Sequence, residues 1–269
     1  MTMPEHEYRR LLRRTLIATA LCIAAVLVCY FWIDRPVAFF VYRHDINKFQ
    51  VFRWLTYPPP EVQNWSPLVL TAIMVRRAWG PFVHWQKVLL VACLSLIVAD
   101  QFRIALGDVC GRYWPETWTH DNPSLIGTGT YGFHPFQRGD DIGSFPSGHA
   151  CRILGFATVW MIATPRSRVV VTVLCAPMLV SLVAMNYHFV SDVIAGSILG
   201  AIIATYAAHL ARLQMRLENP GWVRAVSNAT GNLREQPARS DDLRKRAGEF
   251  LRRSGQPRTP AQLFDAGNC

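Results

Sequence analysis

Apolar residues in this chain are gathered into six blocks, which short polar connections separate. A helix of about 20 apolar residues crosses the hydrocarbon core of a bilayer, so blocks of this kind predict transmembrane helices. We therefore predict an all-α, polytopic membrane protein with six transmembrane helices. The predicted spans cover residues 15–33, 62–75, 88–107, 148–164, 169–187 and 189–211.

The charge of the connections predicts the sides of the membrane. Basic residues precede the first block and recur at residues 76–87, at 166–168 and in the tail. Because basic loops stay in the cytoplasm, we expect both termini there and residues 34–64, 108–147 and 186–189 on the opposite face. In a bacterium the protein would lie in the inner (plasma) membrane, with that face in the periplasm. The net charge of +10 follows this pattern and does not indicate nucleic-acid binding.

Three parts of the chain lie outside these blocks or at their borders. Residues 36–57, between the first two spans, mix aromatic and basic side chains and are expected to form an interfacial helix. We divide the chain into a basic cytoplasmic N-terminus (1–14), a six-helix membrane domain (15–211) and a basic cytoplasmic tail (212–269). The polar, proline- and glycine-containing composition of that tail predicts that most of it is mobile.

Candidate chemistry begins with His188 and Asp192, four residues apart at the start of the sixth block. This spacing puts both side chains on one helix face. There the carboxylate can accept a proton from one imidazole nitrogen and leave the other free to attack. An interfacial histidine satisfied by a neighbouring carboxylate would have the same sequence. A second histidine on the same predicted face, His149, favours the catalytic interpretation.

The stretch Pro146-Ser147-Gly148-His149 opens the fourth block. Ser147 is a typical N-cap, Gly148 permits close approach of a ligand, and the helix start presents unpaired amides. Such a helix end binds phosphate, and His149 on its first turn can donate a proton to a leaving oxygen. A plain capping turn is the alternative interpretation.

Together these residues resemble the type-2 phosphatidic acid phosphatase family, membrane enzymes related to haloperoxidases. The family's Pro-Ser-Gly-His motif is intact at residues 146–149. Its last motif retains Ser181, His188 and Asp192 at the family's spacing. The resemblance covers residues 15–211, including the six-helix layout and the gathering of all motifs on one face.

The chain departs from the family at three cations. Gly107 and Trp114 stand where the first motif has Lys and Arg, and Leu182 replaces the Arg of the last motif. A partly desolvated phosphate needs cations or several amide donors. The candidate replacements are Arg112, Arg152, Arg103 and Arg138. Arg112 lies inside the matching segment. Arg152 lies within a predicted span, where a charge is costly and so suggests a function. Arg103 can also simply neutralise Asp100 three residues before it.

The resemblance implies a metal-independent lipid phosphate phosphatase that needs no cofactor. By this resemblance His188 attacks phosphorus and forms a phosphohistidine, Asp192 orients it, and His149 protonates the leaving oxygen. The phosphate ligands would be Arg112, Ser147, Gly148 and Arg152. The expected substrate is a phospholipid, polyprenyl or lipid A phosphate on the periplasmic face, and the pattern does not distinguish among them.

Three alternatives stay open at this stage. The missing cations fit a non-catalytic lipid-phosphate binder, and a lipid phosphotransferase would have the same residues. A metal site could be built from His149, His188, Asp192 and His134.

The aromatic loop that contains Tyr131, Phe133 and Phe136 fits either a lid over the substrate or an aromatic belt at the membrane surface.

Overall fold

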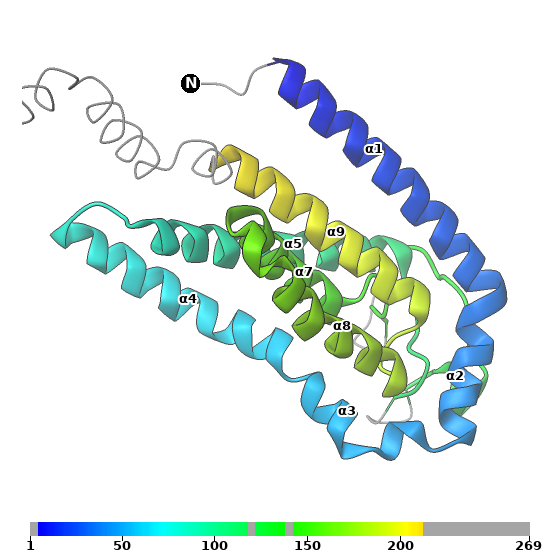
Figure 1. Ribbon diagram of the computed structural model, residues 1–269. Helices are drawn as coiled ribbons and strands as arrows, with labels where there is room; N and C mark the ends of the chain where they lie inside the picture. The colour runs from blue at the N-terminus through cyan, green and yellow to red at the C-terminus, as the bar shows by residue number, and fades with distance from the viewer. Residues whose placement is uncertain (1–4, 118–121, 138–141, 212–269) are drawn as a thin grey trace, which may run out of the picture. The chain divides into compact units, whose positions relative to one another are not determined.

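The first apolar block forms one long helical stretch in the computed structural model (Figure 1). Helix α1 (Glu5–Val28) leads into the π-helical turn η1 (Cys29–Ile33) and then into α2 (Asp34–Arg43). The structure describes residues 5–117, 122–137 and 142–211, which all belong to the compact unit Met1–Gln214. The predictions for the tail and for Arg138 lie outside the described residues.

The segment predicted as one interfacial helix is broken. After α2 come the 3-10 turn η2 (Ile46–Lys48) and the short helix α3 (Gln50–Leu55). Asp45 separates α2 from η2 in the left-handed conformation, with φ 53°. Asp adopts this conformation more readily than most residues because its short polar side chain can bond locally. The turn therefore divides residues 36–57 into separate helices.

The other apolar blocks all fold as helices. They form α4 (Pro58–Arg76), η3 (Arg77–Trp79), α5 (His84–Cys110), α7 (Gly148–Ala163), η4 (Pro165–Ser167), α8 (Arg168–Ala184) and α9 (Val190–Leu210), and a single turn, α6 (Leu125–Thr128), lies in the long loop. Of the described residues 79% are helical and none forms a strand. The all-α prediction is confirmed.

Four helical stretches of the described chain are long and apolar enough to cross a membrane. They are Glu5–Arg43, His84–Cys110, Pro165–Ala184 and Val190–Leu210, and Gly148–Ala163 is a shorter apolar helix. Large apolar side chains such as Trp32 and Val169 are exposed on the outside of this bundle. Long helices with an apolar outer surface indicate an integral membrane protein. The count of six spans stays a prediction.

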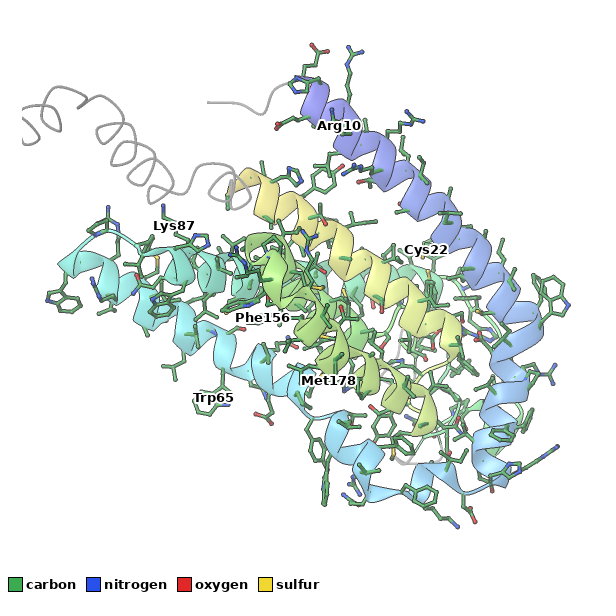
Figure 2. The ribbon with its side chains drawn as sticks, in the orientation of Figure 1. Arg10, Cys22, Trp65, Lys87, Phe156 and Met178 are labelled. Atoms are coloured by element: carbon green, nitrogen blue, oxygen red, sulfur yellow. The ribbon has the colours of Figure 1, made fainter. Side chains whose placement is uncertain are left out.

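The centre of the bundle is formed by α5, α7 and α9, which pack on one another. A cluster of buried small and branched side chains joins them: Val88, Val91, Ala92, Val159, Ala163, Ala204 and Ala208. Phe156 packs against this cluster, whereas Trp65 points outward from α4 (Figure 2). Helix α1 packs on α9, and α4 packs on α5 (Figure 1).

Candidate active site

The two predicted catalytic histidines meet where α7 and α9 begin. His149 is on the first turn of α7 and His188 lies two residues before α9. Their ring centroids are 5.8 Å apart and their ring planes are inclined by 63°. The backbone amide of Ser147 donates to the carbonyl oxygen of Asp192 at 3.0 Å, which ties the two helix starts together.

Two glycines of α9 allow this close crossing. A Cβ atom at Gly196 would overlap the carbonyl oxygen of Ser147, and one at Gly200 would overlap that of Cys151. Glycines four residues apart on one helix face let two backbones approach closely, which is a frequent device in membrane helices. The Gly-Ser-Ile-Leu-Gly run of α9 therefore brings the first turn of α7 to His188.

The partners of His188 determine its tautomer. Its Nδ1 lies 3.0 Å from the carbonyl oxygen of Ser144. Because a carbonyl can only accept, Nδ1 carries the proton and Nε2 keeps its lone pair. Burial lowers the pKa of His188 well below 6.5, and the nearby His149 and the charges of Arg103 and Arg152 lower it further. His188 is therefore neutral at pH 7, with Nε2 as a nucleophilic atom.

Asp192 reaches His188 through Ser144. The predicted spacing does bring the two side chains together, but Asp192 Oδ2 is 3.9 Å from His188 Nδ1, longer than a hydrogen bond. Instead the Ser144 hydroxyl donates to Asp192 Oδ2 at 2.6 Å. The same carboxylate oxygen accepts from the amide of Phe189 at 3.0 Å. Ser144 thus holds Asp192 with its hydroxyl and His188 with its carbonyl.

Two arginines lie on the other side of the histidines, around the buried Asp100. Arg152 Nε is 2.9 Å and Arg103 Nε is 3.6 Å from Asp100 Oδ1. The Nη atoms of both arginines remain as donors for an anion because both contacts to Asp100 use Nε. A Cβ atom on Gly148 would lie 3.1–3.2 Å from the guanidinium of Arg103. The absence of a side chain at Gly148 therefore lets this cation approach the start of α7.

Arg112 has a different environment. Its side chain is 0% exposed, and its Nη1 donates to Asp192 at 2.5 Å while its Nη2 donates to Asp34 at 2.9 Å. Four rings surround its guanidinium carbon, at 4.2–5.4 Å from their centroids: Tyr30, Tyr131, Phe133 and Phe189. Binding of phosphate by Arg112 stays a prediction, and these contacts favour an indirect role.

The other predicted residues of the helix start are also buried. The Ser147 side chain accepts from the amide of Ala150 at 3.4 Å, so Ser147 is the N-cap of α7, as its sequence predicts. This leaves its hydroxyl proton and the amides of Gly148 and His149 directed to the region before the helix.

His134 lies in the long loop and packs on Tyr113, with ring centroids 5.1 Å apart. In the loop predicted as a lid or belt, Phe136 is exposed, but Tyr131 and Phe133 pack around Arg112. Within the described part of the chain, no three His, Cys, Asp or Glu side chains are placed to hold a metal ion. The alternative of a four-residue metal site therefore has no support in this arrangement.

Sequence reasoning did not single out Asp34, Ser144 or Ser191 as functional. All three are buried and bonded to the site. A charge at the end of the first apolar block is the only local signal for Asp34, and the two serines have none apart from their proximity to the histidines.

The comparisons with known proteins agree with this geometry. Residues 88–216 match the model of the PAP2 superfamily. The matched segment contains both histidines, Asp192 and the arginines at positions 103, 112 and 152. Neither the curated proteins nor the solved structures include a match to this chain. The PAP2 match suggests a phosphatase-type activity on phosphate esters. This segment, with its paired histidines at the starts of α7 and α9, matches the PAP2 superfamily, which is consistent with a member of the type-2 phosphatidic acid phosphatase family.

Proposed function

We propose that this protein is a lipid phosphate phosphatase of the membrane, which hydrolyses a phosphate monoester or diphosphate through a phosphohistidine at His188. The observation that carries the proposal is the state of His188: neutral, with Nδ1–H bonded to Ser144 and Nε2 left as a nucleophile beside a second histidine. A neutral imidazole with one nitrogen anchored is the form that attacks phosphorus.

In the first step, Nε2 of His188 forms a bond to phosphorus while the bond from phosphorus to the leaving oxygen breaks. His149 gives its proton to that oxygen, so the lipid leaves as an alcohol or a monophosphate. The positive charge that the imidazole gains is shared with the Ser144 carbonyl, and behind Ser144 stands the carboxylate of Asp192.

In the second step, His149 takes a proton from a water molecule as that water attacks the phosphohistidine. The nitrogen–phosphorus bond breaks, inorganic phosphate leaves, and His188 returns to its neutral form. Catalysis of this reaction consists mainly of positioning and of stabilising charge on the three equatorial oxygens.

The equatorial oxygens are bound by Arg103, Arg152 and the start of α7. Both arginines act on the pKa of His188, which supports their closeness to its ring. The amide of Gly148 and the hydroxyl of Ser147 add donors at a helix N-terminus, where the dipole also favours an anion. Arg112 then supports Asp192 from behind instead of touching phosphate.

The lipid nature of the substrate follows from the membrane setting. We propose six spans, formed by α1, α4, α5, α7, α8 and α9, and we place α2 and α3 at the membrane surface. Basic residues at the ends of α1, α4 and α8 favour cytoplasmic termini. The histidines would then face the periplasm of a bacterial inner membrane, where phospholipid, polyprenyl and lipid A phosphates are within reach.

The test is phosphate release by purified protein in detergent, with EDTA present, from a panel of these lipids. His188→Ala should lower the rate by at least about 10³-fold, as loss of a nucleophile does. His44→Ala is the matched control, because His44 is exposed and bonds only its own helix. Acid-labile, base-stable radiolabel on the wild-type protein, absent from His188→Ala, would support the phosphohistidine.

Other outcomes of this experiment separate the alternatives. Loss of activity with EDTA, restored by a metal, would overturn the metal-independent mechanism. Transfer of phosphate to another lipid, with little free phosphate, would identify a phosphotransferase. Binding of lipid phosphate without turnover by the well-folded wild type would identify a non-catalytic binder.

Membrane topology needs its own test. Trp79 in η3 and Phe136 in the long loop are 74% and 75% exposed and lie on opposite predicted faces. The thiol introduced by Phe136→Cys should react with a membrane-impermeant maleimide in intact spheroplasts, and the thiol introduced by Trp79→Cys should react only after lysis. The opposite labelling pattern would refute the proposed orientation.

A further inference from the structure

Asp34 is a buried acid in a segment that the PAP2 match does not include. It is the first residue of α2, just after the π-helical turn, and 1% of its surface is exposed. An isolated carboxylate at such a place would cost several kcal/mol, so a buried carboxylate is normally paired with a cation or with several donors. The partners of Asp34 therefore indicate its role.

All of its partners belong to the neighbourhood of Asp192. Oδ2 accepts from Arg112 Nη2 at 2.9 Å and from the Ser191 hydroxyl, and Oδ1 accepts from the Ser191 amide at 3.0 Å. The Ser191 hydroxyl in turn accepts from Arg112 Nη1 at 2.6 Å. Ser191 precedes Asp192 and lies 157 residues from Asp34 in the sequence.

The Ser191 amide is one of the first amides of α9, which have no partner inside their own helix. Asp34 supplies that partner from another helix, and its negative charge lies at the positive end of the α9 dipole. The first turn of α9, which carries Asp192, is thereby fixed to α2.

We infer that Asp34 is a positioning residue that acts on the nucleophile through Arg112 and Asp192. Its carboxylate holds one arm of the Arg112 fork, which directs the other arm to Asp192 Oδ1. Asp192 Oδ2 then fixes the Ser144 hydroxyl, and the Ser144 carbonyl fixes the Nδ1–H tautomer of His188. The inference rests on the proposed function of His188 as the nucleophile.

The aromatic rings around Arg112 make this chain of contacts stiff. Tyr131 accepts from Arg112 Nη2 at 3.3 Å and donates at 2.7 Å to the carbonyl of Tyr30, which belongs to the π-helical turn that precedes Asp34. Arg112 therefore has little room to move while Asp34 is in place. Without the Asp34 carboxylate, the Arg112 guanidinium keeps its contact with Asp192 but loses the partner that fixes its orientation.

The test compares Asp34→Asn in two backgrounds. Asn has the shape of Asp and can accept from the Ser191 amide, but its amino group opposes the Arg112 and Ser191 donors. We expect kcat for phosphate release, per active site, to fall about 10- to 100-fold with KM within about 3-fold. In the Asp192→Asn background the same change should lower kcat less than about 3-fold, because the effects of residues that act through one another are not additive.

Two further variants keep the result interpretable. Ser191→Ala removes the hydroxyl bridge but leaves the amide bond to Asp34, and it should lower kcat about 3- to 10-fold if Asp34→Asn fails to fold. Glu116→Gln is the control, because it removes a partly buried carboxylate that bonds Asn47 and Asn186 and has no bond to Arg112 or Asp192. It should leave kcat unchanged. Equal losses from Asp34→Asn in both backgrounds, or an unchanged kcat, would overturn the inference.

A readout without substrate separates this inference from the proposed function. Nitrogen NMR of histidine-labelled protein, assigned with His188→Ala, should show the Nδ1–H tautomer of His188 in the wild type and a mixture in Asp34→Asn. If the wild type releases no phosphate, the proposed function fails, and a changed tautomer would still uphold the positioning role. An unchanged His188 signal in Asp34→Asn would refute that role even in an active enzyme.

Discussion

The crossing of α7 and α9 makes Gly196→Ala an informative change. The added Cβ would overlap the carbonyl oxygen of Ser147 and lie 3.1 Å from the C and N atoms of that residue. All these atoms are backbone atoms, so no side chain can turn away to make room. Because interiors are close-packed, relief of the overlap needs a shift of α9 by about 1 Å.

That shift acts on stability and on catalysis to different degrees. Overpacking of a tight contact costs about 1–3 kcal/mol, while replacing Gly by Ala inside a helix returns up to about 1 kcal/mol. The net loss of stability should therefore be about 0–3 kcal/mol. The hydrogen bond from the Ser147 amide to the Asp192 carbonyl would be lost, and the two histidines would separate. A misplacement of about 1 Å can cost about 10²-fold in rate.

The assay measures kcat for phosphate release and the unfolding temperature in detergent for Gly196→Ala and Gly107→Ala. Gly107, in α5, is the matched control, because its Cβ would lie at an ordinary 3.5 Å from the Phe145 carbonyl. We expect a loss of about 100-fold for Gly196→Ala with a modest change in stability, and a near wild-type rate for Gly107→Ala. A wild-type rate in Gly196→Ala would refute the idea that this crossing sets the spacing of the histidines.

Further predictions concern the charges around His188. Arg103→Gln and Arg152→Gln should each lower kcat/KM about 10- to 100-fold, which corresponds to the loss of a charge-assisted hydrogen bond. Each change should also weaken inhibition by inorganic phosphate. Unchanged phosphate inhibition would exclude these arginines as phosphate ligands. Ser144→Ala keeps the carbonyl for His188 but removes one of the hydrogen bonds to Asp192, and kcat should fall about 10-fold, less than in Asp192→Asn. Because the pKa of His188 is lowered from 6.5 in the folded protein, protonation of His188 should not reduce kcat/KM between pH 7.5 and 6. An acid limb centred at pH 6.5 would contradict this. For the same reason, His188 binds a proton below pH 6.5 in the unfolded protein but not in the folded protein. The free energy of unfolding should therefore fall as the pH drops below 6.5.

The parts of the fold that could be predicted from sequence are those with a local signal. Helices α5, α7, α8 and α9 follow the apolar blocks to within a few residues at each end. The Pro-Ser-Gly-His stretch predicts the N-cap at Ser147, because capping depends on neighbouring residues only. The break at Asp45 had no such signal, because a single left-handed residue in a mixed aromatic and basic segment leaves the composition unchanged.

The sequence predicted that His188, Asp192 and His149 lie close together, but it did not predict the hydrogen bonds that connect them. The spacing of His188 and Asp192 puts them side by side, yet it gives no means to see that Ser144 stands between them. Arg112 was expected to face phosphate because it lies where the first motif should be. Its aromatic surroundings and its second carboxylate, Asp34, come from segments far away in the sequence, and no local pattern reports such contacts.

The structure also gives a physical reason for the changed motif positions. Leu182, where the family has Arg, is 1% exposed and packs with Ala150 and Val193, so this side of the histidines is apolar. Gly107, where the family has Lys, is buried, and a Cβ atom there would lie 3.5 Å from the Phe145 carbonyl oxygen. Cations on α5 and α7 can approach from the opposite side, where Gly148 leaves space for a guanidinium.

The charges on that opposite side match what a phosphate dianion requires. Arg103 and Arg152 share one carboxylate, Asp100, so the group of three carries one net positive charge. In the proposed mechanism His149 supplies the proton that departs with the leaving group. Asp100 accepts a hydrogen bond from Gln63 at 2.8 Å and one from Arg152 Nε at 2.9 Å, while Arg103 Nε lies 3.6 Å away as an ion pair. An anion that offsets part of the positive charge also limits how tightly free phosphate is held, which favours release of the product. The loss of the family's three cations is therefore compatible with the proposed turnover, in which Arg103 and Arg152 would supply the positive charge.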